Sequence, residues 1–92
     1  MKQNKKIFVL TLEEQYHSIT DMLVLGTFSN ERSAKEVMEK TFEDIYNRDY
    51  SNLNKNDYII TKSNDKMTIS EILCNNYAIL KITETILDKW EK

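Results

Sequence analysis

The fold is decided by residues 29–46, Ser-Asn-Glu-Arg-Ser-Ala-Lys-Glu-Val-Met-Glu-Lys-Thr-Phe-Glu-Asp-Ile-Tyr. Its apolar residues return every three or four positions and form one stripe of a helix: Ala34, Val37, Met38, Phe42, Ile45 and Tyr46, with Thr41 on the same side. Ser29 or Asn30 can accept hydrogen bonds from the free N–H groups of a first turn, where Glu31 suits the helix dipole. We therefore predict an amphipathic helix over residues 30–47, with this stripe in the core.

Charged residues occupy the opposite side of this helix: Lys35, Glu36, Glu39, Lys40 and Glu43. The spacing of Glu31 to Lys35, and of Glu36 to Lys40, places opposite charges one turn apart in the favourable orientation. This side of the helix is expected to face solvent.

Two apolar runs precede the helix. Residues 5–12 contain the strand formers Ile7-Phe8-Val9-Leu10, which predicts a strand buried on both faces. Residues 19–28 predict a second strand, joined to the first by the polar connection Glu13–Ser18, and the simplest pairing is an antiparallel hairpin. Alternation in the second strand places Met22, Val24 and Phe28 on one face and Leu23 and Leu25 on the other.

The second half of the chain predicts a polar connection, Asn47–Asn56, and then three strands. These strands are Tyr58–Lys62, Met67–Leu73 and Tyr77–Leu87, with a turn at residues 63–66 between the first two. A helix is the alternative over residues 68–91, because Thr68 and Glu71 fit a capping box, but the many β-branched residues favour strands. The predicted fold class is α+β: an antiparallel sheet with one main amphipathic helix, in the order β-β-α-β-β-β.

Composition narrows the possible classes of protein. The chain has 92 residues, of which 40% are apolar and 30% charged, so we expect one globular domain over residues 1–92. A formal net charge of −2 is too even for a typical nucleic-acid-binding domain, so nucleic acid is not an expected partner. The apolar runs are too short for a signal-peptide core or a membrane span, and Cys74 is the only cysteine, so we expect a cytoplasmic protein without disulfides.

No group of residues forms a recognisable catalytic or metal-binding set. His17 is the only histidine and is expected in an exposed loop, while Cys74 is expected as a small buried apolar residue. The acidic residues Glu43, Asp44, Asp49 and Asp57 lack the spacing of an EF-hand and are expected on a solvated surface. With Gly26 as the only glycine, a phosphate-binding loop is excluded. We therefore predict no catalytic residues, no metal site and no cofactor, and hence a protein that is not an enzyme.

Tyrosine and arginine provide the best indication of a binding surface. Tyr16 lies in the predicted connection Glu13–Ser18, and Arg48 and Tyr50 lie in the connection Asn47–Asn56. Exposed Tyr and Arg side chains are enriched among the residues that dominate protein interfaces. We predict that Tyr16, Arg48 and Tyr50 bind a partner, provided that the two connections lie at the same end of the sheet.

The junction between the second strand and the helix, Gly26-Thr27-Phe28-Ser29 with Ala34 in the following helix, is the basis of a resemblance. Together with Phe8-Val9-Leu10-Thr11 upstream, it resembles small uncharacterised α+β domains of phages and bacterial mobile elements. The likeness covers residues 7–46. It implies the strand–strand–helix fold and a phage-like context, and it supplies no catalytic residues.

These observations favour a small protein-binding module. Its sharpest version is a phage-encoded inhibitor of a host defence complex, acting as anti-CRISPR proteins do. The alternatives are an immunity protein or antitoxin, a self-assembling structural protein that oligomerises through an exposed sheet edge, and a protein that sequesters a small ligand. The expected partner is another protein, or a further copy of the chain, and not a membrane.

Overall fold

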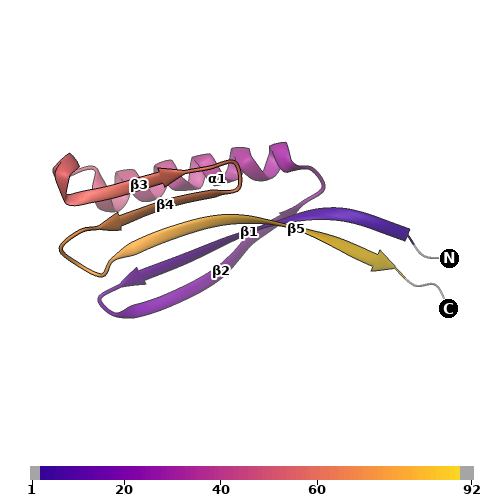
Figure 1. Cartoon of the computed structure of the whole chain (residues 1–92), viewed down its shortest axis with the longest axis horizontal. Coiled ribbons are helices and arrows are strands. Elements are labelled where there is room, and N and C mark those ends of the chain that lie inside the picture. The colour runs from indigo at the N-terminus through magenta and orange to yellow at the C-terminus, as the bar shows by residue number, and fades with distance from the viewer. Residues whose placement is uncertain (1–2, 90–92) are drawn as a thin grey trace.

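The computed structural model describes the backbone of residues 3–89 and the side chains of residues 5–86 (Figure 1). The strands are β1 (Gln3–Tyr16), β2 (Ile19–Phe28), β3 (Tyr58–Lys62), β4 (Lys66–Glu71) and β5 (Tyr77–Lys89), and the main helix is α1 (Glu31–Ile45). A π-helical turn, η1 (Tyr46–Tyr50), continues α1, and a short 3-10 turn, η2 (Lys55–Asp57), precedes β3. The predicted α+β class, antiparallel sheet and single main helix are confirmed, and the order of strands and helix is broadly as expected.

The five strands form one antiparallel sheet in the order β2-β1-β5-β4-β3. The predicted hairpins β1–β2 and β3–β4 are both present, and β5 lies between them, pairing with β1 from Gln3–Lys89 to Gln15–Tyr77. The strand prediction for the C-terminal segment is therefore confirmed over the helical alternative as far as residue 89; residues 90–91 lie outside the described part. A central position in the sheet explains its content of β-branched residues.

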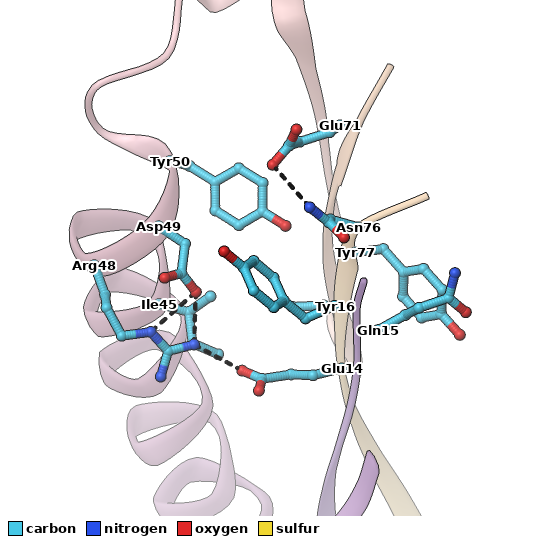
Figure 2. A pocket seen from close by; sticks show the side chains of 11 residues that line it. Glu14, Gln15, Tyr16, Ile45, Arg48, Asp49, Tyr50, Glu71, Asn76 and Tyr77 are labelled. Atoms are coloured by element: carbon cyan, nitrogen blue, oxygen red, sulfur yellow. Dashed lines mark hydrogen bonds and ion pairs between the residues drawn. The ribbon is translucent and has the colours of Figure 1, made fainter. Parts of the chain in front are cut away.

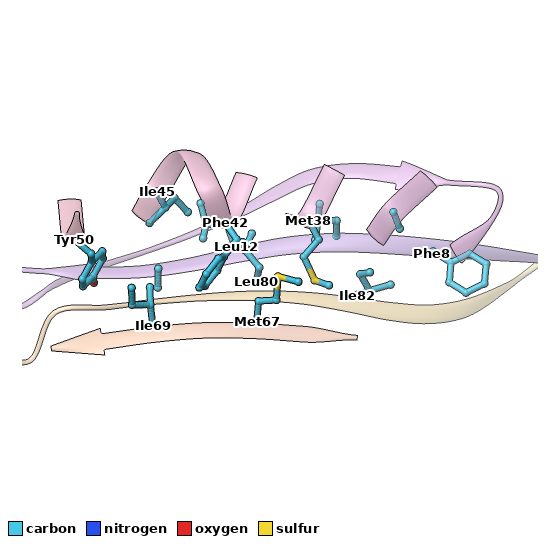
Figure 3. Packing of buried hydrophobic residues seen from close by; sticks show 13 residues of the cluster. Phe8, Leu12, Met38, Phe42, Ile45, Tyr50, Met67, Ile69, Leu80 and Ile82 are labelled. Carbon is cyan, nitrogen blue, oxygen red and sulfur yellow. The ribbon is translucent and has the colours of Figure 1, made fainter. Parts of the chain in front are cut away.

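One face of the sheet carries the core, and α1 covers it (Figure 3). Alternate residues of the strands point to the helix: Phe8, Leu10 and Leu12 of β1, Met67 and Ile69 of β4, and Ala78, Leu80 and Ile82 of β5. Ala34, Met38, Phe42 and Ile45 of α1 are buried against them, as the helical stripe predicts, but Val37 of the same predicted stripe is exposed at its margin. The prediction that β1 is buried on both faces was wrong: Ile7 and Val9 are only half-buried, because no described element covers the second face.

One extra residue in β2 shifts the alternation of its side chains, so the residues after it point to the opposite face of the sheet. Leu10 pairs with Gly26 but Thr11 pairs with Val24, so Leu25 forms a bulge. Phe28 therefore points to the helix side and packs against the core, whereas simple alternation had placed it with Met22 and Val24. A side chain at Gly26 would meet the Phe28 ring at 3.1 Å, so the only glycine of the chain makes room for this ring.

Two predicted connections are shorter than expected. β1 continues through Tyr16, so the turn before β2 is only His17-Ser18, and both residues have positive φ values of 50° and 68°. This is the backbone that a tight two-residue hairpin requires.

At the other end of the helix, residues 46–50 continue as η1 because Tyr46 and Tyr50 pack edge-on against Tyr58 of β3. The Tyr46 and Tyr58 hydroxyls are hydrogen-bonded at 3.0 Å. The polarity of residues 47–56 had suggested an irregular segment and did not show this tyrosine packing. The start of the helix is as predicted: the Ser33 N–H donates to the Asn30 side chain at 2.8 Å.

The two sides of α1 should respond differently to truncation. Phe42 is buried beneath α1 and has the Lys62 ammonium 5.3 Å from its ring centroid, so Phe42→Ala should cost about 3–5 kcal/mol of unfolding free energy. Glu39→Ala, on the exposed side, should change stability by no more than about 0.5 kcal/mol. Urea unfolding measures both, and equal midpoints would show that the helix faces the sheet with a different side.

Candidate partner-binding cleft

The three residues predicted to bind a partner, Tyr16, Arg48 and Tyr50, lie around one open cleft between η1 and the end of the sheet (Figure 2). The cleft has a volume of about 580 Å³. Its lining comes from the end of β1, from the helix end and from both sides of the β4–β5 connection: Glu14, Gln15, Tyr16, Ile45, Arg48, Asp49, Tyr50, Glu71, Asn76, Tyr77 and Ala78. The ring of Tyr77 and the side chain of Gln15 point away toward the other face of the sheet, so the remaining residues define what we call the acidic cleft.

Arg48 joins the helix end to the sheet. Its guanidinium donates to Asp49 Oδ2 at 2.6 and 2.9 Å and to Glu14 Oε1 at 3.1 Å. The hydrogen bond with Asp49, reinforced by that with Glu14, raises the pKa of Arg48 despite partial desolvation. Arg48 is therefore a permanently charged clamp, already paired, that fixes the positions of two carboxylates on the cleft wall.

Tyr50 does not occupy the exposed loop position that the sequence suggested. Its side chain is only 4% exposed, since η1 turns it inward against Tyr58. Its hydroxyl is directed into the acidic cleft and has no hydrogen-bond partner among the described residues (Figure 2). Desolvation is the largest of the effects that together raise the pKa of Tyr50 to about 12; the charges of Glu71, Asp49 and Glu14 add to it and outweigh the opposing charge of Arg48. The potential at this hydroxyl is thus negative.

Tyr16 is the exposed tyrosine of the cleft, with 59% of its side chain accessible. Its hydroxyl lies between the Tyr50 hydroxyl and the Arg48–Asp49 pair (Figure 2). Its ring meets the exposed His17 edge-on at 4.1 Å, which holds the ring beside the turn. An accessible ring with a polar tip is suited to contact with another molecule.

Sequence reasoning did not assign the acidic residues of the candidate site to it: Glu14 and Glu71 were not singled out, and Asp49 was expected on a solvated surface. Asn76 Nδ2 lies 3.5 Å from Glu71 Oε1, and the Glu71 N–H donates to the Asn76 carbonyl, which fixes Glu71 at the rim. Glu71 reaches the cleft only because β4 and β5 pair beside β1. No local pattern in the sequence predicts this strand order. The lining carries three carboxylates and one guanidinium, so the cleft has a formal excess of two negative charges (1 − 3 = −2).

Cys74 was expected to be buried, and this was wrong. It is exposed in the connection between β4 and β5, where the chain makes the turn and buries no side chain. A hydrogen bond with Glu71 and the charge of that carboxylate raise the pKa of the Cys74 thiol. The thiol therefore stays protonated at neutral pH and is a poor nucleophile.

The acidic residues of the helix end show the solvated environment that was expected for most of them. Glu43, Asp44 and Asp49 are exposed, and Asp57 is half-buried. Within the residues that the structure describes, no three His, Cys, Asp or Glu side chains gather closely enough to hold a metal ion.

No family model, curated protein or solved structure matches this chain. In residues 3–89, no helix is long and apolar enough to cross a membrane. The case for a function therefore rests on the geometry of the site.

The Tyr50 hydroxyl should be visible in the pH dependence of stability. Because the folded pKa lies above the ordinary value of about 10, the unfolded chain releases its proton first, and stability should fall as pH rises from about 10 to about 12. Tyr50→Phe should keep stability near wild type at pH 7 and show a smaller loss over this range. Urea unfolding at the two pH limits measures the difference; Tyr58 and Tyr77 titrate in both proteins and cancel. An equal loss of stability in the two proteins would contradict this prediction and show that the Tyr50 hydroxyl is as well solvated in the folded as in the unfolded chain.

Proposed function

We propose that this chain is a small non-enzymatic protein-binding module, and that its acidic cleft receives a basic side chain of a protein partner. The observation that carries the proposal is the convergence of Glu14, Asp49 and Glu71 on one open cleft beside two tyrosines. Arg48 alone opposes them, and it is already engaged in ion pairs with Glu14 and Asp49. The cleft thus offers more carboxylate than its own cation neutralises.

The chemistry of the cleft suits a lysine or arginine side chain. The negative potential that raises the pKa of Tyr50 also favours a cation at the same place. The Tyr50 hydroxyl oxygen and the Glu71 carboxylate can accept hydrogen bonds from the incoming group, and the exposed ring of Tyr16 can interact with its charge. Arg48, suggested by the sequence as a direct anchor, acts in this proposal by positioning Glu14 and Asp49.

The shape of the cleft favours a protein over a small ligand as its occupant. Sites for small ligands are concave and mostly apolar, whereas this cleft opens at the surface, its lining is polar and apolar in nearly equal parts, and four of its side chains are charged. The sharper hypothesis of a phage-encoded inhibitor of a host defence complex rests on the resemblance of residues 7–46 to phage domains. An immunity protein or antitoxin would use the same cleft, and neighbouring genes would distinguish the two.

A short peptide with a central lysine should bind in the acidic cleft. Binding is followed by amide chemical shifts with the peptide Gly-Gly-Lys-Gly-Gly, blocked at both ends, and with its norleucine counterpart. We expect shifts at Glu14, Asp49, Tyr50 and Glu71 for lysine only. Glu71→Gln should weaken binding about tenfold, the value of one charge-assisted hydrogen bond.

Glu39→Gln is the matched control, because it removes the same charge from the exposed side of α1, and it should leave binding unchanged. Equal binding of the norleucine peptide, or equal effects of the two substitutions, would contradict a cation site in the cleft. Binding should also weaken with added salt, since the cleft is open to solvent.

Binding of the physiological partner should depend on the cleft and not on the charged helix face. The double variant Tyr16→Ala, Glu71→Gln should lose more than about 2 kcal/mol of binding free energy, the usual threshold for an interface hot spot. Tyr16 is exposed, so folding should be preserved. Quantitative affinity capture from cells of the source organism compares this variant with Lys35→Ala, Glu39→Ala; loss of the partner only in the latter would place the interface on α1.

A further inference from the structure

The strand β2 forms an open edge of the sheet and exposes apolar side chains on both of its faces. No other strand of residues 3–89 pairs with its outer side. Five large apolar residues of this strand are between 37% and 67% exposed: Ile19, Met22, Leu23, Val24 and Leu25. Clusters of exposed apolar residues on folded proteins mark interaction surfaces, and an unpaired apolar edge strand is a template for another strand.

The two edges of the sheet differ in a way that singles out β2. The opposite edge, β3, has five residues and ends in Lys62, and a short charged edge strand resists pairing. β2 has ten residues, no proline and no basic residue, and Asp21 is its only charge. Its bulge at Leu25 distorts the second half of the strand, so residues 19–24 remain as a regular open edge.

The helix leaves this part of the sheet uncovered. Leu12 and Leu23 are paired across β1 and β2 and share the helix side, yet Leu12 is 7% exposed and Leu23 is 55% exposed. α1 begins after β2 and ends beside β3, where Tyr46 contacts Tyr58, so its second half lies away from Leu23. β2 forms the margin of the sheet on the side away from β3 and β4 (Figure 1).

We infer that a second copy of this chain pairs with β2, antiparallel and about a two-fold axis at Leu23, so that the two five-stranded sheets join into one continuous sheet. In this register Leu23 lies opposite Leu23 of the other copy, and Met22 lies opposite Val24. The pairs match apolar residues with apolar residues on both faces of the sheet, which is how cross-strand pairs stabilise a sheet. Such a two-fold interface is closed and ends with the dimer.

The distribution of charge favours a second copy over a different protein. A partner selected by charge would need a complementary charge pattern on β2, but this strand presents one carboxylate among ten residues. Two copies of this nearly neutral strand can pair with each other, provided that the two Asp21 carboxylates do not lie opposite one another. With the axis at Leu23, residues 22–24 pair within the regular part of the edge, whereas Asp21 lies opposite the bulged residue Leu25 and is four positions from the other Asp21, about 14 Å along the strand. An axis at Asp21 would set the two carboxylates against each other.

This inference is independent of the proposed function, because no residue of β2 lines the acidic cleft. The first test is the mass of the full chain by sedimentation equilibrium from about 1 μM to about 1 mM, the range of weak to moderate affinities. We expect a dimer. Leu23→Lys should raise its dissociation constant at least about tenfold, because it places two like charges face to face.

Ile59→Lys is the matched control, since Ile59 is 54% exposed on the opposite edge strand β3. It should leave the dimer intact, and circular dichroism checks the folding of both variants. A wild-type chain that stays monomeric at the highest concentration would overturn the inference. So would a dimer that is lost with Ile59→Lys and kept with Leu23→Lys. Leu23→Lys should leave lysine-peptide binding unchanged, which separates the two proposals.

Cross-linking tests the register. In a Cys74→Ser background, which removes the only native cysteine, Leu23→Cys should form a covalent dimer under mild oxidation, since directly opposed Cα atoms lie about 4.5–5.5 Å apart. Thr20→Cys lies six positions from its mate, about 20 Å away in this register, and should react at least about tenfold more slowly. Equal rates for the two variants would overturn pairing about Leu23.

Discussion

The structure depends on the contact between one apolar stripe of α1 and one face of the sheet. Leu10, Met38, Ile69 and Leu80 are the large side chains that this contact buries most completely. Because β1 and β5 are long and central, the helix meets the sheet along their middle and cannot extend over every strand. A single helix on a five-stranded sheet must leave part of the helix side, and the whole second face, without cover from the described elements. The acidic cleft and the β2 edge both lie at the limits of this contact. The cleft lies where the helix ends, and the β2 edge lies where α1 no longer covers the sheet.

The parts of the fold that depend on local periodicity and residue propensity could be predicted from the sequence. The helical stripe from Ala34 to Ile45, the bounds of β2 and β3, and the β-branched C-terminal strand follow from periodicity and propensity, and each is present. The face on which Phe28 lies was predicted wrongly, because a bulge at Leu25 shifts the alternation of side chains by one residue. The continuation of the helix into η1 was lost because it depends on Tyr46 and Tyr50 meeting Tyr58, a contact between distant segments.

The sequence indicated where the candidate site lies, but not which other residues it contains. Tyr16, Arg48 and Tyr50 do come together, because the β1–β2 turn and the end of the helix lie at the same end of the sheet. Polarity of the sequence implied that Tyr50 is exposed, but aromatic packing in η1 buries it. Glu71 was missed since its approach depends on the insertion of β5 between β1 and β4. The types of residue therefore indicated which end of the molecule carries the candidate site. That this site is acidic could be known only from the order of the strands, which brings Glu71 to the cleft.

The two proposed surfaces differ in the interactions that each offers, and this difference would let both be used at once. The acidic cleft offers charge and hydrogen-bond acceptors, so a partner bound there would be selected by electrostatic complementarity and its binding would weaken with added salt. The β2 edge offers backbone hydrogen-bonding groups and apolar side chains, so it depends on shape and register and is nearly indifferent to salt. Because the cleft lies on the η1 side and includes no β2 residue, pairing through β2 would leave it open in both copies. A dimer would then present two clefts in fixed relation, and a partner with two suitably spaced basic side chains would bind more tightly than either cleft alone allows.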